Sequence, residues 1–304
     1  MVVFFSLAGC SDLQRFGYEQ GLQFENWRAG LEARELTTSD GLVWFYLDSA
    51  PESTVDSAKP TLLLLHGFGA DSSNWVRFAG KLVNEHRVIA PDIIGHGAST
   101  SNTSIDYHYK NQAERVALFM DTLGVQSYHV AGNSMGGAIS VNLAVQRPDK
   151  VLSVALLNSA GITVETPGFL ALQKDGNNPL IVREPEDMFV TMDWASEDPP
   201  YLPDFFIRVM GEKKAANSAV AQKMWLDVNG DNNQQLALQQ LKQPVFILWG
   251  EEDRLLSLEN VPEFQKLIPH AQVKTLDGIG HLPMVEAPSQ SAAILSDFWQ
   301  AKRG

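Results

Sequence analysis

The sequence predicts an α/β fold with a mostly parallel central sheet and helices on both of its faces. The first observation is a set of short, nearly continuous apolar runs, which suit strands buried on both sides: 61–67, 86–92, 127–133, 151–159, 244–250 and 271–278. The second is a set of helix candidates that lie mostly between those runs: 111–124, 136–149, 261–269 and 289–302. Alternation of strand and helix is typical of a doubly wound sheet.

The ends of several elements are marked in the sequence. Residues 33–48 read as two strands around the turn Ser39-Asp40-Gly41, which predicts a hairpin before the alternating part of the chain. Gly124 is typical of a helix C-cap, and Pro148 stops the helix that begins at about residue 136.

The alternation breaks between residues 161 and 241. This stretch has no strand-like run, several apolar helical faces and frequent proline. A surface excursion, or part of the core's own helical layer, would explain it. Its density of Phe, Met, Leu and Trp favours a helical cap over something apolar. We therefore expect a core of residues 33–160 and 242–304, with an inserted cap at 161–241.

Composition limits the classes of function. A length of 304 residues allows one large domain, or one domain with an insertion, and 44% hydrophobic and 19% charged residues are ordinary for a soluble globular enzyme. A net charge of −13 without a Lys/Arg cluster argues against nucleic-acid binding. Cys10 is the single cysteine, so no intrachain disulfide can form. The sequence has no HExxH motif, no zinc-type Cys/His spacing and no GxxxxGK[ST] loop, so we expect no metal and no cofactor. It does not define an oligomeric state.

Ser134 lies among unusually small residues in the stretch Gly132-Asn133-Ser134-Met135-Gly136. A flexible glycine loop is one explanation. The pattern Gly-x-Ser-x-Gly, with a strand before it and a helix after it, instead predicts a nucleophile elbow, where the serine lies on a tight turn. The N-terminus of the helix then offers N–H groups and a positive dipole end to a developing oxyanion.

A serine nucleophile needs a base, and the base needs a carboxylate to orient it. In this arrangement the acid and then the histidine follow the serine along the chain. Glu251, Glu252 and Asp253 come directly after one strand run, and His281 follows the last run in a glycine-flanked loop. The carboxyl ends of parallel strands meet at one edge of a sheet, so these side chains are expected to lie near Ser134.

Five motifs together resemble the α/β-hydrolase superfamily from about residue 33 onward: HGFG (66–69), PDIIGHGAS (91–99), GNSMGG (132–137), WGEEDRLL (249–256) and GHLPMVEAP (280–288). The resemblance implies an α/β-hydrolase fold with a Ser134, Asp253 and His281 triad. It implies that the backbone N–H groups of Phe68 and Met135 form the oxyanion hole. His66 in this pattern is structural and ties loops together by hydrogen bonds.

Serine at the elbow argues against haloalkane dehalogenases and epoxide hydrolases, which resemble this fold but have aspartate there. The motifs are most similar to cold-adapted bacterial lipases and monoacylglycerol-lipase-like hydrolases. This implies a serine hydrolase that cleaves short- or medium-chain acyl esters, monoacylglycerol or other lipids through an acyl-enzyme. Carbon–carbon bond hydrolases of aromatic degradation share the GNSMGG form, and Arg183 and Arg208 could bind their substrate's carboxylate. A catalytically silent, membrane-tethered binding protein is the third reading, against which the intact triad argues.

Residues 1–32 are expected to form a lipoprotein-type signal and N-terminal tether. Leu7-Ala8-Gly9-Cys10 resembles a bacterial lipobox, although the segment is short and has no Lys or Arg before its apolar run. A start codon placed too far downstream would explain both departures. The resemblance implies attachment to the membrane of the bacterial cell envelope through a lipidated Cys10. A chance cysteine in a disordered tail would leave the protein cytoplasmic.

Two details refine this N-terminal prediction. Ser11 follows the cysteine where inner-membrane retention in enteric bacteria usually has Asp, which favours the outer membrane. Residues 11–30 are then a tether or a short amphipathic helix, with an apolar side of Phe16, Leu22, Phe24 and Trp27.

Overall fold

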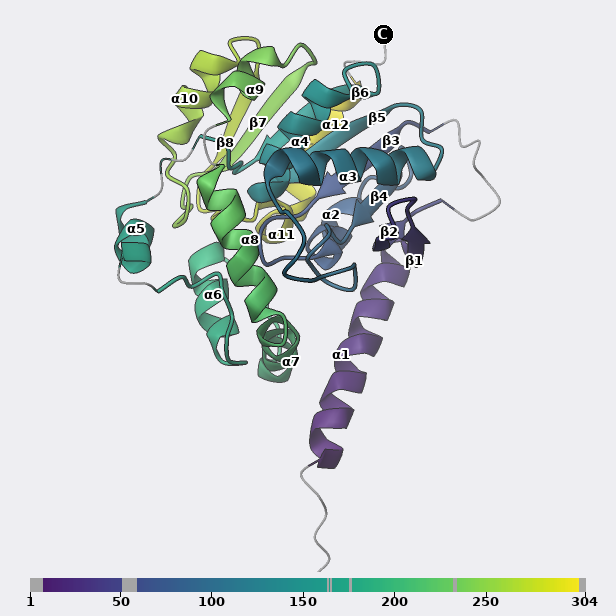
Figure 1. The fold of residues 1–304 in the computed structure, drawn as a ribbon, viewed down its shortest axis with the longest axis vertical. Coiled ribbons are helices and arrows are strands. Elements are labelled where there is room, and N and C mark those ends of the chain that lie inside the picture. The colour runs from purple at the N-terminus through teal and green to yellow at the C-terminus, as the bar shows by residue number, and fades with distance from the viewer. Residues whose placement is uncertain are drawn as a thin grey trace, which may run out of the picture.

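The computed structural model describes residues 8–50, 59–162, 164, 166–174, 177–231 and 234–300. Within them, eight strands form one sheet in the order β1-β2-β4-β3-β5-β6-β7-β8 (Figure 1). The strands are β1 Glu32–Thr37, β2 Val43–Asp48, β3 Thr61–Leu65, β4 Arg87–Pro91, β5 Tyr128–Asn133, β6 Val151–Leu157, β7 Val245–Gly250 and β8 Gln272–Leu276. β1 pairs antiparallel with β2, β2 pairs antiparallel with β4, and all other pairings are parallel. The predicted α/β-hydrolase fold and its mostly parallel sheet are confirmed.

The strands form where the apolar runs predicted them, because the runs are covered on both faces. Every residue of β3, β5 and β7 is buried. β8 differs from the expectation, since Gln272 and Lys274 are exposed and only Leu276 is buried. β8 is one of the two edge strands of the sheet, with β7 as its single neighbour, so one side of it remains in contact with solvent.

Helices cover the two faces of the sheet and enclose two apolar cores. On one face α3 Tyr109–Thr122 and α4 Met135–Gln146 pack together, and Phe119 and Ile139 lie in the first core. On the other face α2 Val76–Ala79 and α12 Pro288–Gln300 pack together over the second core. Neighbouring residues of β3 point alternately into the two cores, with Leu63 in the first and Leu64 in the second. The sheet is therefore held from both sides, as the alternating sequence predicts.

The segment between β6 and β7 contains helices and no strand among its described residues. They are α5 Pro167–Lys174, α6 Asp187–Ala195, α7 Asp204–Ala215, α8 Ser218–Gly230 and α9 Gln235–Gln240. α6 and α7 contact each other and share a small apolar cluster of Val182, Met188 and Ile207. α9 instead packs on α4 and on α10 Asn260–Leu267, next to the sheet. The predicted cap boundaries of 161 and 241 stay a prediction.

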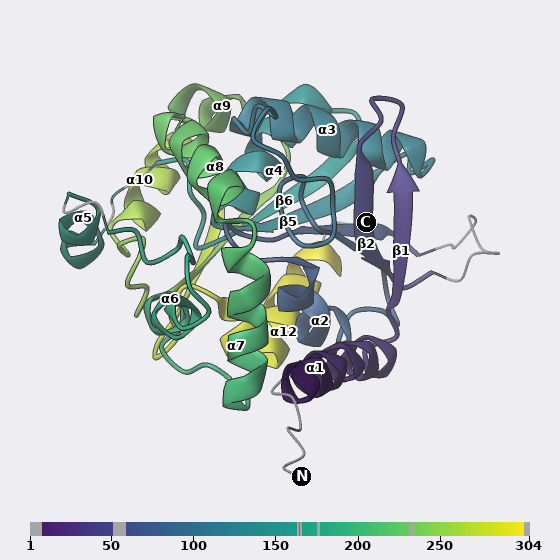
Figure 2. The same ribbon diagram turned by 60° about the horizontal axis from the view of Figure 1, so that its bottom comes forward.

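A 21-residue helix, α1 Ala8–Arg28, precedes the sheet and contacts α7, α2 and β1 (Figure 2). Tyr18 is buried, with its ring centroid 5.0 Å from that of Phe206, and a Cβ on Gly21 would lie 2.5 Å from the Phe206 ring. Leu22 is half-buried. The other residues of the expected apolar side face solvent instead, with 59%, 56% and 74% of Phe16, Phe24 and Trp27 exposed. The helix therefore packs on α7 through Tyr18 and Gly21, and the hydrophobic pattern did not indicate these two contact positions.

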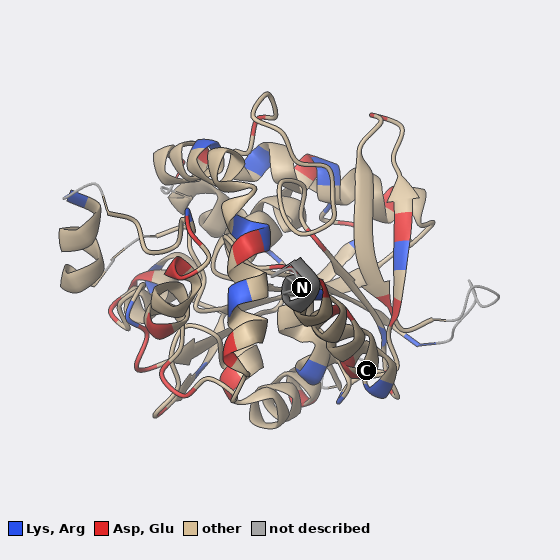
Figure 3. Cartoon of the chain, turned by 90° about the horizontal axis from the view of Figure 1, so that it is seen from below, with Lys and Arg blue, Asp and Glu red and all other residues tan. Residues whose placement is uncertain are grey.

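The surface carries mixed charge. Acidic and basic side chains are interspersed over the helices of the face seen in Figure 3. None of the helices in the described residues combines the length and apolar character needed to cross a bilayer. Residues 1–7 of the expected signal lie outside the described residues, as does the side chain of Cys10.

Candidate active site

Ser134 forms the turn between β5 and α4, as the sequence predicts. Its φ of 53° and ψ of −120° are a conformation that side-chain-bearing residues rarely adopt. The turn is tight enough to need glycine on both sides. A Cβ on Gly132 would lie 2.2 Å from the Gly136 carbonyl oxygen, and one on Gly136 would lie 2.2 Å from the Leu65 oxygen. The backbone thus holds Ser134 at the carboxyl edge of the sheet, with its residue half-buried.

His281 and Asp253 are brought together at the same edge. The His281 Nδ1 atom lies 2.7 Å from Asp253 Oδ2, and both residues are buried. The second oxygen, Oδ1, accepts the backbone N–H groups of Leu255 and Leu256 at 2.8 and 2.9 Å. The other two acids considered in the sequence, Glu251 and Glu252, are exposed. The geometry therefore favours Asp253 as the partner of the imidazole.

Asn158 completes the surroundings of Asp253, and sequence reasoning missed it. Its Nδ2 donates to Asp253 Oδ2 at 2.8 Å, and its Oδ1 accepts the Gly250 N–H at 3.0 Å. The residue is fully buried and has a positive φ of 42°. With His281 and the two backbone donors, the Asp253 carboxylate accepts four hydrogen bonds. The sequence offered one indication of this role: Asn158 directly follows the β6 run, at the carboxyl edge of the sheet where functional groups gather.

Asn133 links the serine turn to the histidine loop. Its Nδ2 donates to the Leu157 oxygen and to the backbone oxygen of His281, both at 3.0 Å. Because Asn133 directly precedes Ser134, this bond fixes the histidine backbone relative to the turn. The role of Asn133 was also not predicted, although Asn133 occupies the first of the two variable positions in the Gly-x-Ser-x-Gly motif.

The expected oxyanion-hole residues lie beside Ser134. Phe68, Met135, Ser134 and His281 line one small pocket. Among the described residues, the backbone N–H groups of Phe68 and Met135 have no hydrogen-bond acceptor. Two free N–H groups next to a serine hydroxyl are an arrangement that can stabilise negative charge on an oxygen.

The loop that carries Phe68 is fixed by two buried histidines and one lysine. His66 donates from Nδ1 to the Gly67 oxygen at 2.8 Å, and its Nε2 accepts the Ile93 N–H at 2.9 Å, in agreement with the expected structural role. Burial lowers the pKa of His66 to about 4, so it is neutral in the folded protein near pH 7. His96 Nε2 accepts the Gly69 N–H at 3.1 Å, and Lys214 of α7 donates to the Gly69 oxygen.

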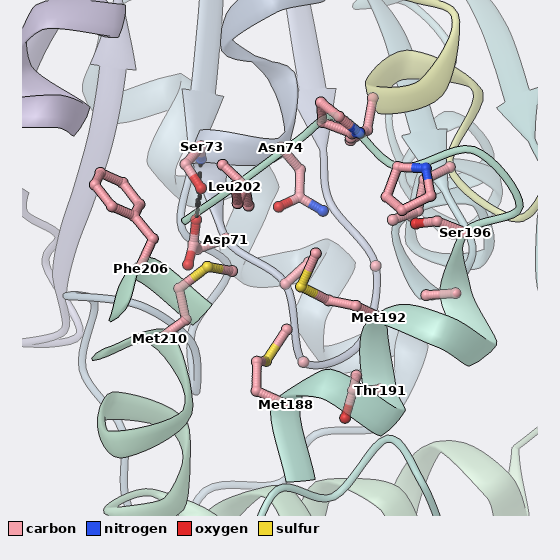
Figure 4. A pocket seen from close by; sticks show the side chains of 18 of the residues that line it. Asp71, Ser73, Asn74, Met188, Thr191, Met192, Ser196, Leu202, Phe206 and Met210 are labelled. Atoms are coloured by element: carbon pink, nitrogen blue, oxygen red, sulfur yellow. Dashed lines mark hydrogen bonds between the residues drawn. The ribbon is translucent and has the colours of Figure 1, made fainter. Parts of the chain in front are cut away.

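Two apolar pockets meet at Ser134 and His281. The larger has a volume of about 370 Å³ and is bounded by side chains of α1, α6 and α7. Figure 4 shows the Met188 and Met192 side chains of α6 and the Met210 side chain of α7 pointing toward this pocket. The smaller, of about 50 Å³, has aromatic walls that include Phe169 and Trp225. A substrate with an apolar part on each side of the reacting carbon fits this geometry.

The two cap arginines lie away from this site. Arg183 donates to Gln222 at 3.3 Å, and Arg208 pairs with Glu186. Neither arginine lines either of the two pockets. Among the described residues that line the larger pocket, one is a lysine, Lys214.

A group of possible metal ligands outside both pockets was not predicted from the sequence. Ligand atoms of Asp106, His108 and Asp227 lie within 4.8 Å of one another. Lys223 already pairs with Asp227, and His108 Nδ1 already lies 2.5 Å from Asp106. The existing hydrogen bonds account for the cluster.

Comparisons with known proteins agree with the fold. The family model described as "alpha/beta hydrolase fold" matches residues 60–288. Lipase 1 of Psychrobacter immobilis is 35% identical over 275 residues, which cover 89% of this chain and 85% of that protein. Monoacylglycerol lipase ABHD6 of Bos taurus is 26% identical over 253 residues, covering 79% and 75%. The crystal structure of a membrane phospholipase A, a bacterial virulence factor, is 34% identical with a TM-score of 0.90, covering 96% of this chain and 93% of that one. The chain therefore belongs to the α/β-hydrolase family, as a hydrolase of the lipase and esterase type.

Proposed function

We propose that the protein is a serine carboxylesterase or lipase that cleaves short- and medium-chain acyl esters, monoacylglycerol or related lipids through an acyl-enzyme. The observation that carries this proposal is the position of Ser134 and His281 on the same two apolar pockets, with the imidazole paired to Asp253 at 2.7 Å. The names of the lipase relatives support an ester or lipid substrate.

In the proposed mechanism, the Ser134 hydroxyl oxygen attacks the acyl carbon and His281 Nε2 takes the hydroxyl proton. Asp253 holds the Nδ1–H tautomer and stabilises the imidazolium that forms. The Phe68 and Met135 N–H groups bind the oxygen that becomes negative in the tetrahedral intermediate. The imidazolium then gives its proton to the departing alcohol, which leaves the acyl group on Ser134.

The second half repeats these steps with water as the nucleophile. His281 removes a proton from water, whose oxygen attacks the acyl carbon, and the same N–H groups stabilise the second oxyanion. Collapse of that intermediate returns the proton to Ser134 and releases the carboxylic acid. No metal ion or organic cofactor is needed in this scheme.

The test is covalent labelling combined with ester hydrolysis. A fluorophosphonate should add one phosphonyl group to Ser134, located by peptide mass spectrometry, and should abolish hydrolysis of a chromogenic ester. Ser134→Ala should neither label nor hydrolyse. A labelled residue other than Ser134 would contradict the proposal. Faster cleavage of a vinylogous diketone than of any ester would assign the protein to the carbon–carbon bond hydrolases instead.

We also propose that the protein works at a bacterial membrane, attached through a lipidated Cys10. Beside the lipobox-like sequence, α1 supports this with exposed apolar side chains along one side: Leu13, Phe16, Phe24 and Trp27. Two of them, Phe24 and Trp27, have ring centroids 5.9 Å apart. Two or more acyl chains hold a protein stably on a bilayer, and an apolar helix face beside them adds to that attachment.

The intact mass of the mature protein tests whether Cys10 carries a lipid anchor. Expressed from its native start in a Gram-negative host, the protein should begin at Cys10, carry a diacylglyceryl group and sediment with the outer membrane. Cys10→Ser should abolish the lipid mass and leave ester hydrolysis unchanged. An unmodified Cys10 with residues 1–9 still attached would refute the lipid anchor and would leave the hydrolase proposal standing.

A further inference from the structure

The carboxylate of Glu286, the last residue of α11 Pro283–Glu286, holds the backbone on both sides of His281. Its Oε2 accepts the Gly280 N–H at 2.9 Å, and its Oε1 accepts the Leu282 N–H at 3.0 Å. One side chain thus fixes the residue before and the residue after the imidazole. Hydrogen bonds to a charged acceptor are stronger than neutral ones, so this is a firm restraint on the loop.

The approach of Glu286 depends on the missing side chain at Gly280. A Cβ at residue 280 would lie 3.2 Å from each Glu286 carboxylate oxygen and 2.7 Å from the Glu197 nitrogen. Residue 280 therefore has to be small for the carboxylate and the neighbouring chain to meet there. Glu286 itself lines neither pocket that reaches Ser134, so it does not touch the site where substrate would lie.

The same carboxylate reaches the segment between α6 and α7. Oε2 also accepts the N–H groups of Glu197 and Asp198, at 2.8 and 3.0 Å. A second bond runs nearby, since Arg254, the residue after Asp253, donates to the Asp193 oxygen at 2.8 Å and pairs with Glu197. The His281 loop is thereby fastened to the segment that follows α6, and the Asp253 loop is fastened to that segment and to α6 itself.

We propose that Glu286 is a positioning residue for the hydrolysis reaction. It fixes the His281 backbone so that Nδ1 stays on Asp253 and the ring stays at the two pockets that Ser134 also lines, and it ties that loop to the segment at 197–198. The proposal rests on the proposed function, in which His281 is the base. Its contribution is to kcat, because it acts on the geometry of the base and makes no contact with the substrate.

The first test is Glu286→Gln and Glu286→Ala, assayed with a short-chain chromogenic ester that makes few contacts with the cap. A glutamine has one acceptor oxygen, so an NH₂ group must face either the Leu282 N–H or the three donors on Oε2. Misplacement of a catalytic group by about 1 Å costs on the order of 100-fold in rate. We expect kcat to fall by roughly ten- to a hundred-fold in Glu286→Gln, and further in Glu286→Ala, while KM stays unchanged. Gly280→Ala, which displaces the carboxylate without removing its charge, should also lower kcat.

The matched control is Asp187→Asn. Asp187 is likewise a carboxylate that accepts two backbone N–H groups, from Arg183 and Glu184 at 2.8 and 2.9 Å, but it does so away from His281. The Asp187→Asn variant should keep the wild-type kcat. If the glutamate variants and Gly280→Ala all fold and keep the wild-type kcat, or if only KM rises, the positioning role is wrong. Should Glu286→Ala fail to fold, the other two variants decide. The His281→Ala variant distinguishes a failure of the positioning role from a failure of the proposed function, because wild-type activity in that variant would overturn the proposed function itself.

Discussion

Replacing Asp253 with asparagine should convert the imidazole of His281 to a tautomer that cannot accept the serine proton. Leu255 and Leu256 both donate backbone N–H bonds to Oδ1, and neither backbone donor can turn away. The single amide oxygen of the substituted side chain would therefore face these two groups. Its NH₂ group would face His281 Nδ1, which must then become an acceptor, so the ring proton moves to Nε2.

The expected fall in kcat follows from the loss of the proposed base. In serine proteases the same substitution leaves the site intact and lowers kcat by about 10⁴-fold, which is roughly 5 kcal/mol of transition-state stabilisation. We expect a comparable loss in kcat for a short-chain chromogenic ester. Stability should fall less, by about 1–3 kcal/mol, because the Asn158 Nδ2 donor at 2.8 Å would face another donor. Thermal unfolding and circular dichroism should therefore show a folded protein.

Glu251→Gln and Glu252→Gln are the matched controls for this experiment. Both glutamates are exposed and precede Asp253 in the same loop. Each control should retain the wild-type kcat and unfolding temperature. The reasoning fails if the three variants lose activity equally, or if Asp253→Asn remains within about tenfold of the wild type.

Three other predictions follow from the site and its surroundings. Ser134→Ala and His281→Ala should each lower kcat by several orders of magnitude, and the double variant should be little worse than either, because the two groups act as one unit; losses that multiply would contradict this. In a series of chromogenic esters, kcat/KM should rise by about fourfold per CH₂, or roughly 0.8 kcal/mol, until the pocket is filled, and a flat series would argue against acyl binding there. Burial lowers the pKa of His66 to about 4, so the contribution of His66 to stability falls as the pH drops from about 6.5 to 4. Burial raises the pKa of Asp92 to about 6, so the contribution of Asp92 to stability rises as the pH drops below about 6. Asp92→Asn should therefore lose more stability than the wild type between pH 6.5 and 4.5, measured by denaturant unfolding, and an equal or smaller loss would show that Asp92 is not protonated in the fold.

The parts of the fold that the sequence predicted are those determined by local pattern. Apolar runs covered on both faces gave the strands, and the Gly-x-Ser-x-Gly turn could be placed because glycine is sterically required at 132 and 136. β8 departed from the pattern because exposure depends on how many neighbours a strand has, which a single run of sequence does not encode. The order of the sheet, with β4 between β2 and β3, is likewise a property of the whole chain.

The packing of α1 was not predictable from hydrophobicity for a related reason. A helix is expected to bury its apolar side, yet α1 buries Tyr18 and packs the half-buried Gly21 against Phe206, and Phe16 and Trp27 remain in solvent. Close packing needs a small residue where an aromatic ring approaches, and this requirement comes from the partner helix α7. Intact mass and sedimentation test the proposed membrane attachment without relying on this apolar side.

The residues that orient the proposed triad were missed because their role is visible only across loops distant in sequence. Asn133 reaches the backbone of His281, 148 positions away, and Asn158 reaches Asp253, 95 positions away. Glu286 holds the same histidine loop from the other side. Loops lack the repeating hydrogen bonds of a sheet or helix, so a catalytic loop keeps its geometry only if side chains supply those bonds. The position of the proposed nucleophile could be predicted from a local motif, because its turn requires glycine on both sides. The side chains that orient the proposed base come from distant parts of the chain, and only the assembled fold brings them together.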